Sequence, residues 1–322
     1  MRAMRCLAVD VGGSGLRVTW AGERRGPVGR SGGVRLGPTG IDSADLVERA
    51  LALAGDVDDG RGEGVDRLVW STRGLMLQDP GPLREMLVAR TGCAHVAIVS
   101  DAVGSLVGAL GAVEPGAVVA AGTGAVAFAT DLDATWRRVD GWGHVLGDEG
   151  SSAWLGLAGM RAALRAVDDR PRGSRALLDA ARELLGEPAT WPRQTMTGPH
   201  APALLGSMAP AVTAAADGGD EVAAELCARA GTALACSLLD AAAGLPDVPL
   251  TAVGGLLGAA RVRAALEEEV ARHGRVLRPA AGDALDGARL LALRWRTHQL
   301  PHHEAHLRSA GAPPGQVARS GS

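Results

Sequence analysis

Residues 7–19 read Leu7-Ala-Val-Asp10-Val-Gly12-Gly13-Ser14-Gly15-Leu-Arg17-Val-Thr19, an apolar run that enters a glycine turn and leaves as a second apolar run. Because glycine has no Cβ, the backbone N–H groups of such a turn can approach phosphate oxygens closely. Asp10, at the end of the first run, is well placed to hold Mg²⁺ through water. The alternative interpretation is that Asp10 only orders the turn with its side chain.

Two further glycine loops follow apolar runs later in the chain. They read Gly116-Ala-Val-Val-Ala-Ala-Gly122-Thr123-Gly124 and Leu250-Thr-Ala-Val-Gly254-Gly255-Leu-Leu-Gly258. Thr123 can offer a hydroxyl and an N–H group to a phosphate, and Gly254 and Gly255 would let a strand turn against a purine. Simple turn geometry would explain either loop alone. Three such loops in order predict a nucleotide held between two lobes.

The composition is that of an ordinary globular protein, and the length is sufficient for two domains. The chain has 322 residues, 47% of them hydrophobic, and a net charge of −3. This charge gives no electrostatic reason to expect nucleic acid or an anionic membrane as a partner. The sequence contains no Lys, Asn or Tyr. Basic and amide roles therefore fall to Arg, Gln, Ser, Thr or the backbone.

The four cysteines are scattered and form no C-x-x-C pair: Cys6, Cys93, Cys227 and Cys236. Buried free thiols in a reducing cytosol are the expected interpretation. The residues before Leu7 lead directly into a strand, and we see no apolar run of the ~20 residues that a membrane span needs. We therefore expect a cytoplasmic protein.

Short Val-rich runs bounded by Gly or Asp predict strands at 5–11, 16–21, 66–71, 95–100, 117–121, 125–130 and 249–253. Amphipathic stretches predict helices at 41–54, 82–90, 104–110, 152–167, 174–185, 201–217, 220–243, 259–273 and 284–295. This alternation predicts an α/β fold with a parallel-type sheet in each half.

The same pattern predicts an N-terminal lobe at 1–113, a C-terminal lobe at 114–283, a helix at 284–296 that returns to the first lobe, and a flexible tail at 297–322. The tail contains His302, His303, Glu304 and His306. His302 and His306 have helical i, i+4 spacing, but no other ligand converges on them. We therefore expect no metal site there.

Two acidic positions stand out beyond Asp10. Asp101 closes the run from Val96 to Ser100 and opens a helix, so its carboxylate lies at the open end of the sheet, where ligands of such sheets bind. It is either a base that accepts a proton or a helix N-cap. Asp148 and Glu149 lie in a glycine-dense loop before the next helix, where they contact a ligand or cap that helix. His144, in the same loop, receives no catalytic role.

The ordered set of motifs resembles the N-acetylglucosamine kinase-like branch of the BadF/BadG/BcrA/BcrD ATPase family, within the actin, hexokinase and heat-shock-protein superfamily. The segments that carry the resemblance are Asp10-Val-Gly-Gly-Ser14, Ser100-Asp101-Ala, Gly122-Thr123-Gly124, Gly141-Trp-Gly-His-Val-Leu-Gly-Asp148-Glu-Gly-Ser151 and Val253-Gly254-Gly255. The fourth of these is the most specific, because generic ATPases of the superfamily lack it.

The resemblance implies a two-lobed, actin-like ATPase fold of the ribonuclease H-like type, with ATP and Mg²⁺ in a cleft between the lobes. It implies a phosphotransferase with an alcohol acceptor, which phosphorylates the 6-hydroxyl of N-acetylglucosamine or a related hexosamine, and a homodimer. Asp101 would be the catalytic base and Asp10 the magnesium ligand. The nucleotide would be bound by Gly12, Gly13, Ser14, Gly122, Thr123, Gly124, Gly254 and Gly255. The sugar would be bound by Asp101, Asp148, Gly143, Thr39, Ser71 and Thr123.

The chain departs from the family pattern around the sugar. Where relatives usually carry an asparagine, this chain has none, so that contact is either replaced by Thr39 or Arg35 or absent. Arg73 follows Ser71 near the expected sugar pocket. An arginine there disfavours a free amine and suits an acid or phosphate.

Two alternatives from other functional classes remain. An ATPase activator of a reductase or dehydratase would need cysteines at a dimer interface to hold an iron–sulfur cluster, and no cluster pattern is visible. A sugar-sensing regulator without catalytic activity would normally add a helix-turn-helix, and we expect none ahead of Leu7. An inactive scaffold would be expected to lose Asp10 or Asp101, and both are present.

Overall fold

The computed structural model describes residues 4–12, 15–22, 25–32, 36–37, 40–58, 60, 64–75, 79–196, 201–294 and 306–309. Contacts divide the chain into two compact units. The N-terminal unit comprises Met1–Gly104 and Ala284–Ser322, and the C-terminal unit comprises Ser105–Asp283. The division falls within helix α3 (Asp101–Leu110), earlier in the chain than the boundary proposed after residue 113.

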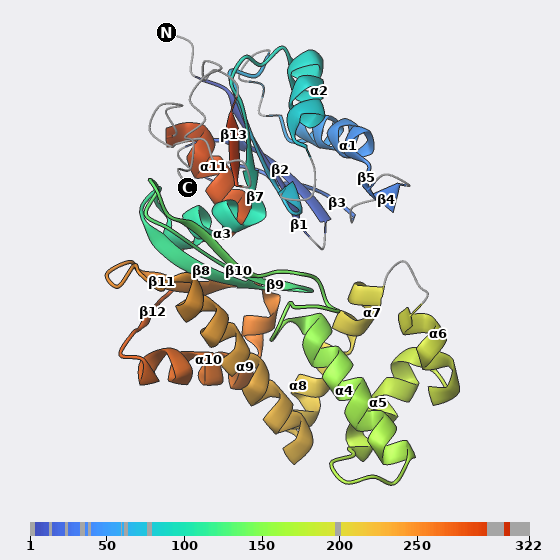
Figure 1. The fold of residues 1–322 in the computed structure, drawn as a ribbon. Helices are drawn as coiled ribbons and strands as arrows, with labels where there is room; N and C mark the ends of the chain where they lie inside the picture. Colours follow the sequence, from blue (N-terminus) through green and yellow to red (C-terminus); the bar gives the residue numbers. More distant parts are fainter. Residues whose placement is uncertain are drawn as a thin grey trace, which may run out of the picture. The chain divides into compact units, whose positions relative to one another are not determined.

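The N-terminal unit contains a six-stranded mixed sheet in the order β13-β7-β6-β1-β2-β3 (Figure 1). Its strands are β1 (Cys6–Gly12), β2 (Gly15–Ala21), β3 (Gly29–Ser31), β6 (Arg67–Thr72), β7 (Val96–Ser100) and β13 (Leu307–Ser309). Strands β1, β6 and β7 are parallel, whereas β2, β3 and β13 run antiparallel to their neighbours. A separate two-stranded ribbon joins β4 (Leu36–Gly37) to β5 (Gly40–Ile41).

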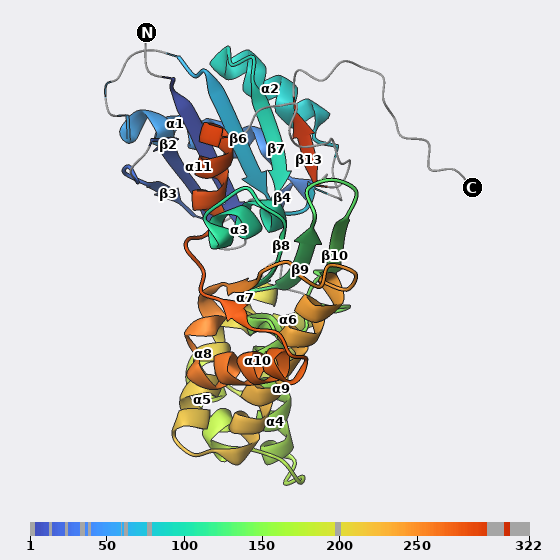
Figure 2. The same ribbon diagram turned by 90° about the vertical axis from the view of Figure 1, so that its left-hand side faces the viewer.

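Successive side chains along the parallel strands point to opposite faces of this sheet. Val9, Trp70 and Ile98 lie side by side in register on one face and are fully buried under α1 (Ser43–Asp56) and α2 (Gly81–Thr91). Asp42 caps α1, because its carboxylate accepts the N–H of Asp45. The other face is covered by α11 (Ala284–Arg294), as Figure 2 shows.

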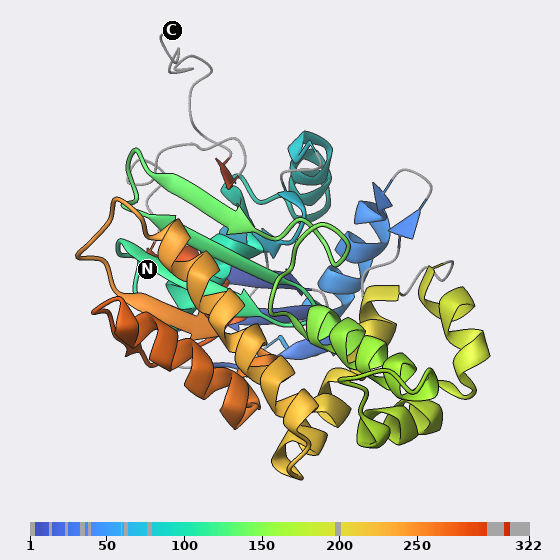
Figure 3. The same ribbon diagram turned by 60° about the horizontal axis from the view of Figure 1, so that its bottom comes forward.

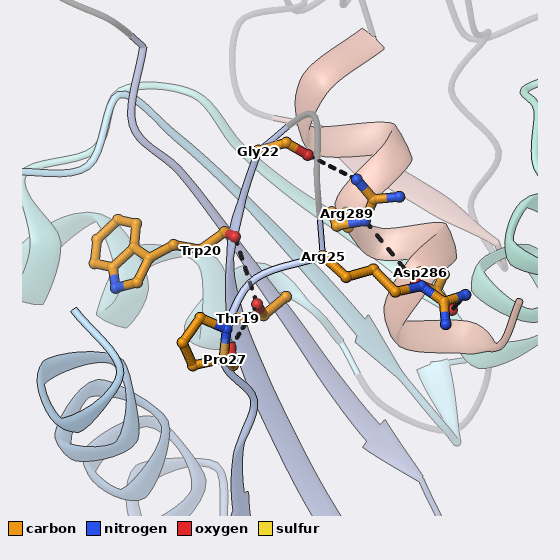
Figure 4. A network of polar contacts seen from close by, with 7 residues as sticks. All are labelled: Thr19, Trp20, Gly22, Arg25, Pro27, Asp286 and Arg289. Carbon is orange, nitrogen blue, oxygen red and sulfur yellow. Dashed lines mark hydrogen bonds and ion pairs between the residues drawn. The ribbon is translucent and has the colours of Figure 1, made fainter. Parts of the chain in front are cut away.

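Polar contacts join α11 to the segment that follows β2 (Figure 4). Arg289 donates to the carbonyl oxygen of Gly22 at 2.7 Å, and Arg25 forms an ion pair with Asp286 at 2.7 Å. Thr19 stabilises the adjoining turn, because its hydroxyl donates to the carbonyl of Pro27 at 2.8 Å. The last of the described helices therefore packs on the first sheet.

The C-terminal unit contains a five-stranded mixed sheet in the order β10-β9-β8-β11-β12. Its strands are β8 (Gly116–Ala121), β9 (Ala125–Thr130), β10 (Trp136–Asp140), β11 (Leu250–Val253) and β12 (Leu277–Arg278). Strands β8, β11 and β12 are parallel, and the β8–β9–β10 meander is antiparallel. The first sheet has the same arrangement when β13 is left out. In both sheets three parallel strands lie side by side, and two antiparallel hairpin strands extend the sheet at one side of them.

Helices make up most of the remainder of this unit. They are α4 (Ser152–Val167), α5 (Arg175–Leu185), α6 (Trp191–Met196), α7 (Ala201–Ser207), α8 (Ala209–Asp217), α9 (Glu221–Ala241) and α10 (Ala260–Arg272). Figure 3 shows α9 and α10 side by side along the sheet, and α4 and α5 pack beyond them. Of the described helices, α9 is long and apolar enough by composition to cross a bilayer, so the expectation that no run reaches this length is wrong. Half of the apolar stretch of α9 is nevertheless buried inside the protein.

The structure corrects several other expectations. Both sheets are mixed, because the β-hairpins contribute antiparallel strands. The helix predicted at 201–217 is divided in two, since Pro210 in the first turn of α8 cannot donate a backbone hydrogen bond to a continuous helix. Residues 307–309, expected in a flexible tail, form β13 against β7. His306 is buried beside it, whereas the other tail histidines lie outside the described residues.

Candidate functional site

In the N-terminal unit, predicted site residues lie at the carboxyl ends of neighbouring parallel strands. Asp10 on β1 is in register with Ser71 on β6, and Thr72 on β6 is in register with Ser100, the residue before Asp101. Carboxyl ends of parallel strands meet at one edge of a sheet, where such folds bind ligands. Asp10 and Asp101 therefore occupy the same edge of the first sheet.

Asp10 is 2% exposed and is paired with an arginine that sequence reasoning did not identify. Arg17 lies directly opposite it on β2, and its Nε and Nη2 atoms donate to Oδ2 of Asp10 at 3.0 and 2.6 Å. The length of the glycine turn would have given this register, because a hairpin that pairs Gly12 with Gly15 also pairs Asp10 with Arg17. The guanidinium offsets the carboxylate charge beside the first glycine loop.

The first loop itself is only partly described. Gly12 ends β1, and a Cβ added there would make only ordinary contacts near 4 Å. Gly13 and Ser14 lie outside the described residues, as do Thr39 and Arg35. The predictions for these four residues remain predictions.

The residues present fit a magnesium ion held mainly by a nucleotide. Among the residues that the structure describes, no three His, Cys, Asp or Glu side chains gather into a metal site. Mg²⁺ in nucleotide enzymes keeps several waters and takes one or two carboxylates together with phosphate oxygens. Asp10 supplies a single carboxylate, and one of its oxygens accepts hydrogen bonds from Arg17. This fits a magnesium ion bound mostly by water and phosphate oxygens better than one bound entirely by protein ligands.

Asp101 is the first residue of α3 and is partly exposed. Ser100 precedes it at the N-cap position, and its Oγ accepts the N–H of Val103 at 3.4 Å. Ser100 thus makes a capping hydrogen bond at the start of α3. Ser100 is also tied to His306, since its N–H donates to the His306 carbonyl at 2.9 Å and its Oγ lies 3.4 Å from Nδ1.

Ser71 and Arg73 differ from each other in exposure. Ser71 is fully buried, and a Cβ built on Gly104 would lie 2.5 Å from its Oγ, so the hydroxyl lies beneath the first turn of α3. Arg73 is exposed at the end of β6, where its N–H donates to the carbonyl of Val11 at 3.2 Å. Arg73 is thus the more accessible of the two at this edge.

In the C-terminal unit, the second glycine loop is the tight β8–β9 turn. The N–H of Gly122 donates to the carbonyl of Gly124 at 2.9 Å. The carbonyls of Gly122 and Thr123 accept the N–H groups of Ser152 and Ala153 at the start of α4. The loop is therefore fixed by its carbonyl oxygens to the beginning of that helix.

The glycine-dense loop before α4 brings Asp148 to this turn. A Cβ added at Gly124 would lie 2.6 Å from Oδ2 of Asp148, so only glycine permits the carboxylate to lie there. The other carboxylate oxygen accepts the N–H of Gly143 at 3.2 Å. The structure thus brings together Gly124, Gly143 and Asp148, next to Thr123.

Neither Asp148 nor Glu149 caps α4. Ser151 occupies the N-cap position, and its Oγ accepts the N–H of Trp154 at 3.1 Å. Glu149 is exposed, and His144 is partly exposed in the same loop. Sequence reasoning also missed Asp140, which bonds to the backbone of this loop at both of its ends.

The third glycine loop lies beside the second. Gly254 adopts φ 118°, and a Cβ there would lie 2.1 Å from the carbonyl oxygen of Ala121 at the end of β8. Only glycine can be accommodated at this position. Gly255 opens the turn Gly255–Gly258 and has no atom within 4 Å of its would-be Cβ. The second and third loops therefore leave adjacent parallel strands, β8 and β11, at the same edge.

The fold is that of known sugar kinases. A crystal structure of a candidate N-acetylglucosamine kinase from Chromobacterium violaceum has a TM-score of 0.72 at 24% identity, covering 91% of this chain and 100% of that one. A ROK family glucokinase from Streptomyces griseus, in complex with glucose and AMPPNP, has a TM-score of 0.60 at 17% identity, covering 90% of this chain and 100% of that one.

A curated relative is the N-acetylmuramic acid/N-acetylglucosamine kinase of Clostridium acetobutylicum, 28% identical over 150 residues. The alignment covers 44% of this chain and 48% of the relative, so the chain matches about half of that protein's length. A family model matches residues 39–292, which is most of the chain. The chain therefore belongs to the BadF/BadG/BcrA/BcrD ATPase family.

Proposed function

We propose that this protein is an ATP-dependent sugar kinase, which transfers the γ-phosphate of ATP to a hydroxyl of N-acetylglucosamine or a related hexosamine. The observation that carries the proposal is the contact of the Asp148 carboxylate with Gly124 in the second glycine loop. The loop predicted to bind phosphate and the acid predicted to orient the sugar lie side by side there within one unit. Membership of an ATPase family and the kinase activity of the curated relative support it.

In this proposal Asp101 is the general base. Its carboxylate accepts the proton of the sugar 6-hydroxyl as that oxygen bonds to the γ-phosphorus, and the bond from phosphorus to the β–γ bridging oxygen breaks to release ADP. Asp148 accepts hydrogen bonds from other sugar hydroxyls and so orients the acceptor.

The glycine loops bind the nucleotide in the same proposal. Backbone N–H groups at Gly12, Thr123 and Gly124 would hold the phosphates, whereas the N–H of Gly122 is bonded to the carbonyl of Gly124 and shapes the turn. Gly254 and Gly255 would approach the adenosine. Bound near Asp10, Mg²⁺ supplies positive charge that neutralises the phosphate oxygens. Arg17, already paired with Asp10, keeps a second positive charge at this loop.

Arg73 bears on the class of sugar that the site would accept. The exposed Arg73 at the end of β6 favours an acidic amino sugar over one with a free amine, because a guanidinium pairs with a carboxylate and repels an ammonium. N-acetylmuramic acid, which the curated relative phosphorylates by its description, carries such a carboxylate. It therefore belongs among the substrates tested.

The cysteines give little support to the ATPase-activator alternative. Cys6, Cys93 and Cys227 are buried, and burial raises the pKa of each thiol. Only Cys236 of the four is exposed. A cluster shared by two copies needs two accessible thiolates from each chain. The sensor alternative would be expected to lack turnover although it binds sugar.

The test is a coupled assay of ADP release over a panel of N-acetylglucosamine, N-acetylmuramic acid, glucosamine, N-acetylmannosamine and glucose. It compares the wild type with Asp101→Asn and with a control, Asp247→Asn, at an exposed aspartate outside the site. We expect sugar-dependent turnover that falls about 10²- to 10⁴-fold in Asp101→Asn and is unchanged in the control. ATP hydrolysis indifferent to every sugar would overturn the kinase proposal and favour the activator.

Two companion properties stay predictions. We expect a homodimer, which light scattering at assay concentration would measure, and a cytoplasmic location, which cell fractionation would measure.

A further inference from the structure

Asp140, the last residue of β10, makes an unusual set of hydrogen bonds. Its Oδ1 accepts the N–H of Gly141 at 2.7 Å and the N–H of Asp148 at 2.7 Å. Its Oδ2 accepts the N–H of Glu149, also at 2.7 Å. One carboxylate thereby joins the first and the last residues of the loop from 140 to 149.

The backbone at this point favours only a few residue types. Asp140 adopts φ 61° and Gly141 adopts φ 78°, both in the left-handed region. Aspartate tolerates this conformation better than most residues, because its short side chain bonds to nearby backbone groups. The left-handed backbone of Asp140 thus occurs where its carboxylate accepts three backbone N–H groups.

Arg138 holds the carbonyl side of the same turn. Its Nε donates to the carbonyl of Asp140 at 2.8 Å, and its Nη2 donates to the carbonyl of Gly141 at 2.9 Å. The guanidinium also lies 4.6 Å from the ring centroid of Trp142. Asp140 and Arg138 together therefore bind both the N–H and the carbonyl groups at the start of the loop.

The far end of the loop is Asp148, which needs such support. Asp148 also adopts a left-handed conformation, with φ 56°, although it is not glycine. Its carboxylate is held between the N–H of Gly143 and the Gly124 turn. Rotation of its backbone would move the carboxylate away from Gly124, and the bond from its own N–H to Asp140 opposes that rotation.

We propose that Asp140 is a positioning residue for the sugar: its carboxylate closes the 140–149 loop and so fixes the carboxylate of Asp148 beside Thr123 and Gly124. The proposal rests on the proposed function, in which Asp148 binds the sugar hydroxyls. Asp140 acts through the backbone and touches neither reactant. It should therefore affect the sugar more than the nucleotide.

Two substitutions separate its contributions. Asp140→Gly keeps the left-handed backbone accessible and removes all three hydrogen bonds. Asp140→Asn keeps one acceptor oxygen and tolerates the same backbone, but presents an amide to the third donor. The matched control is Asp131→Gly at the other end of the β9–β10 hairpin. There the carboxylate also accepts two backbone N–H groups, from Asp133 at 2.9 Å and Thr135 at 2.8 Å, and supports no predicted site residue.

The experiment measures initial rates over sugar and ATP concentrations, with hydrogen exchange of the peptide that covers residues 141–149. For Asp140→Gly we expect faster exchange in this peptide and kcat/KM for the sugar about 10- to 100-fold lower, with KM for ATP unchanged. Asp140→Asn should recover part of both losses. Asp131→Gly should resemble the wild type in sugar kinetics.

The outcomes separate this proposal from the kinase assignment. Active wild-type enzyme whose sugar kinetics and loop exchange are unaffected by Asp140→Gly would overturn the role of Asp140 alone. Equal losses for sugar and ATP, or equal effects in the Asp131 control, would indicate general destabilisation and also overturn it. Wild-type protein without turnover on any sugar would overturn the kinase assignment and the sugar role of Asp140 together. If Asp140→Gly fails to fold, Asp140→Asn decides on the same readouts.

Discussion

At the residue scale, the ion pair of Asp10 and Arg17 can be tested by removing one partner. Arg17 is 24% exposed while Asp10 is almost fully buried, so Arg17→Ala would leave a buried carboxylate without its ion pair. We expect the free energy of unfolding to fall by ~2 kcal/mol, below the 3–5 kcal/mol of fully buried pairs because water screens the arginine. Urea denaturation measures this change.

The control for this variant is Arg30→Ala. Arg30 lies opposite Arg17 on β3 but is exposed, and its loss should change the stability by less than ~0.5 kcal/mol. The double variant Asp10→Asn with Arg17→Ala should recover part of the lost stability, because no buried charge then remains unpaired. Equal losses in Arg17→Ala and Arg30→Ala would contradict the pairing argument.

At the element scale, α9 holds two cysteines in different environments. Cys227 is fully buried, and burial raises its pKa from 9.0 to about 11, whereas Cys236 on the same helix is exposed. At pH 8 we expect a thiol reagent to modify Cys236 in the native protein and to reach the other three cysteines only after unfolding. Mass spectrometry of the labelled peptides would identify the site, and Cys236→Ala should abolish native labelling.

The raised pKa of Cys227 also predicts how stability depends on pH. The folded state disfavours its thiolate, so this group contributes no pH dependence below about pH 9, where both states hold the proton. Between about pH 9 and 11 the unfolded chain loses the proton first, and stability falls as the pH rises. The decrease should be smaller in Cys227→Ala than in Cys236→Ala.

Elements with a strong local pattern could be predicted from the sequence, whereas those defined by pairing could not. Strand β9 and helix α4 have the predicted bounds, because Val-rich alternation and a long amphipathic run are both local signals. Strands β3 and β12 contain three and two residues and exist only through their neighbours. Among site residues, Asp10 and Asp101 follow from strand ends, but Arg17 and Asp140 required the hairpin register and the loop conformation.

At the scale of the whole molecule, the same strand order occurs in both units, and in both there are predicted site residues at the carboxyl ends of parallel strands. Asp10 lies near the end of β1 and Asp101 follows β7, while Gly122 and Gly254 follow β8 and β11. The carboxyl edge of a parallel sheet is where such folds bind ligands, because the loops that leave its strands gather there. The first sheet thus supplies Asp10, Asp101 and the first glycine loop, and the second sheet supplies the other two glycine loops.

Strand β13 breaks this correspondence, because it adds an edge strand to the first sheet alone and lies beyond the residues matched by the family model.

We expect a chain that ends after residue 305 to be less stable by ~2 kcal/mol than one that ends after Ser309, since it loses the β13–β7 hydrogen bonds and the His306–Ser100 contact. The two chains differ only by residues 306–309. Hydrogen exchange should show faster exchange in β7 and β6 of the shorter chain and unchanged exchange in β8–β12. Because Asp101 directly follows β7, kcat should fall as well, and equal exchange in β7 of both chains would show that β13 does not support this edge.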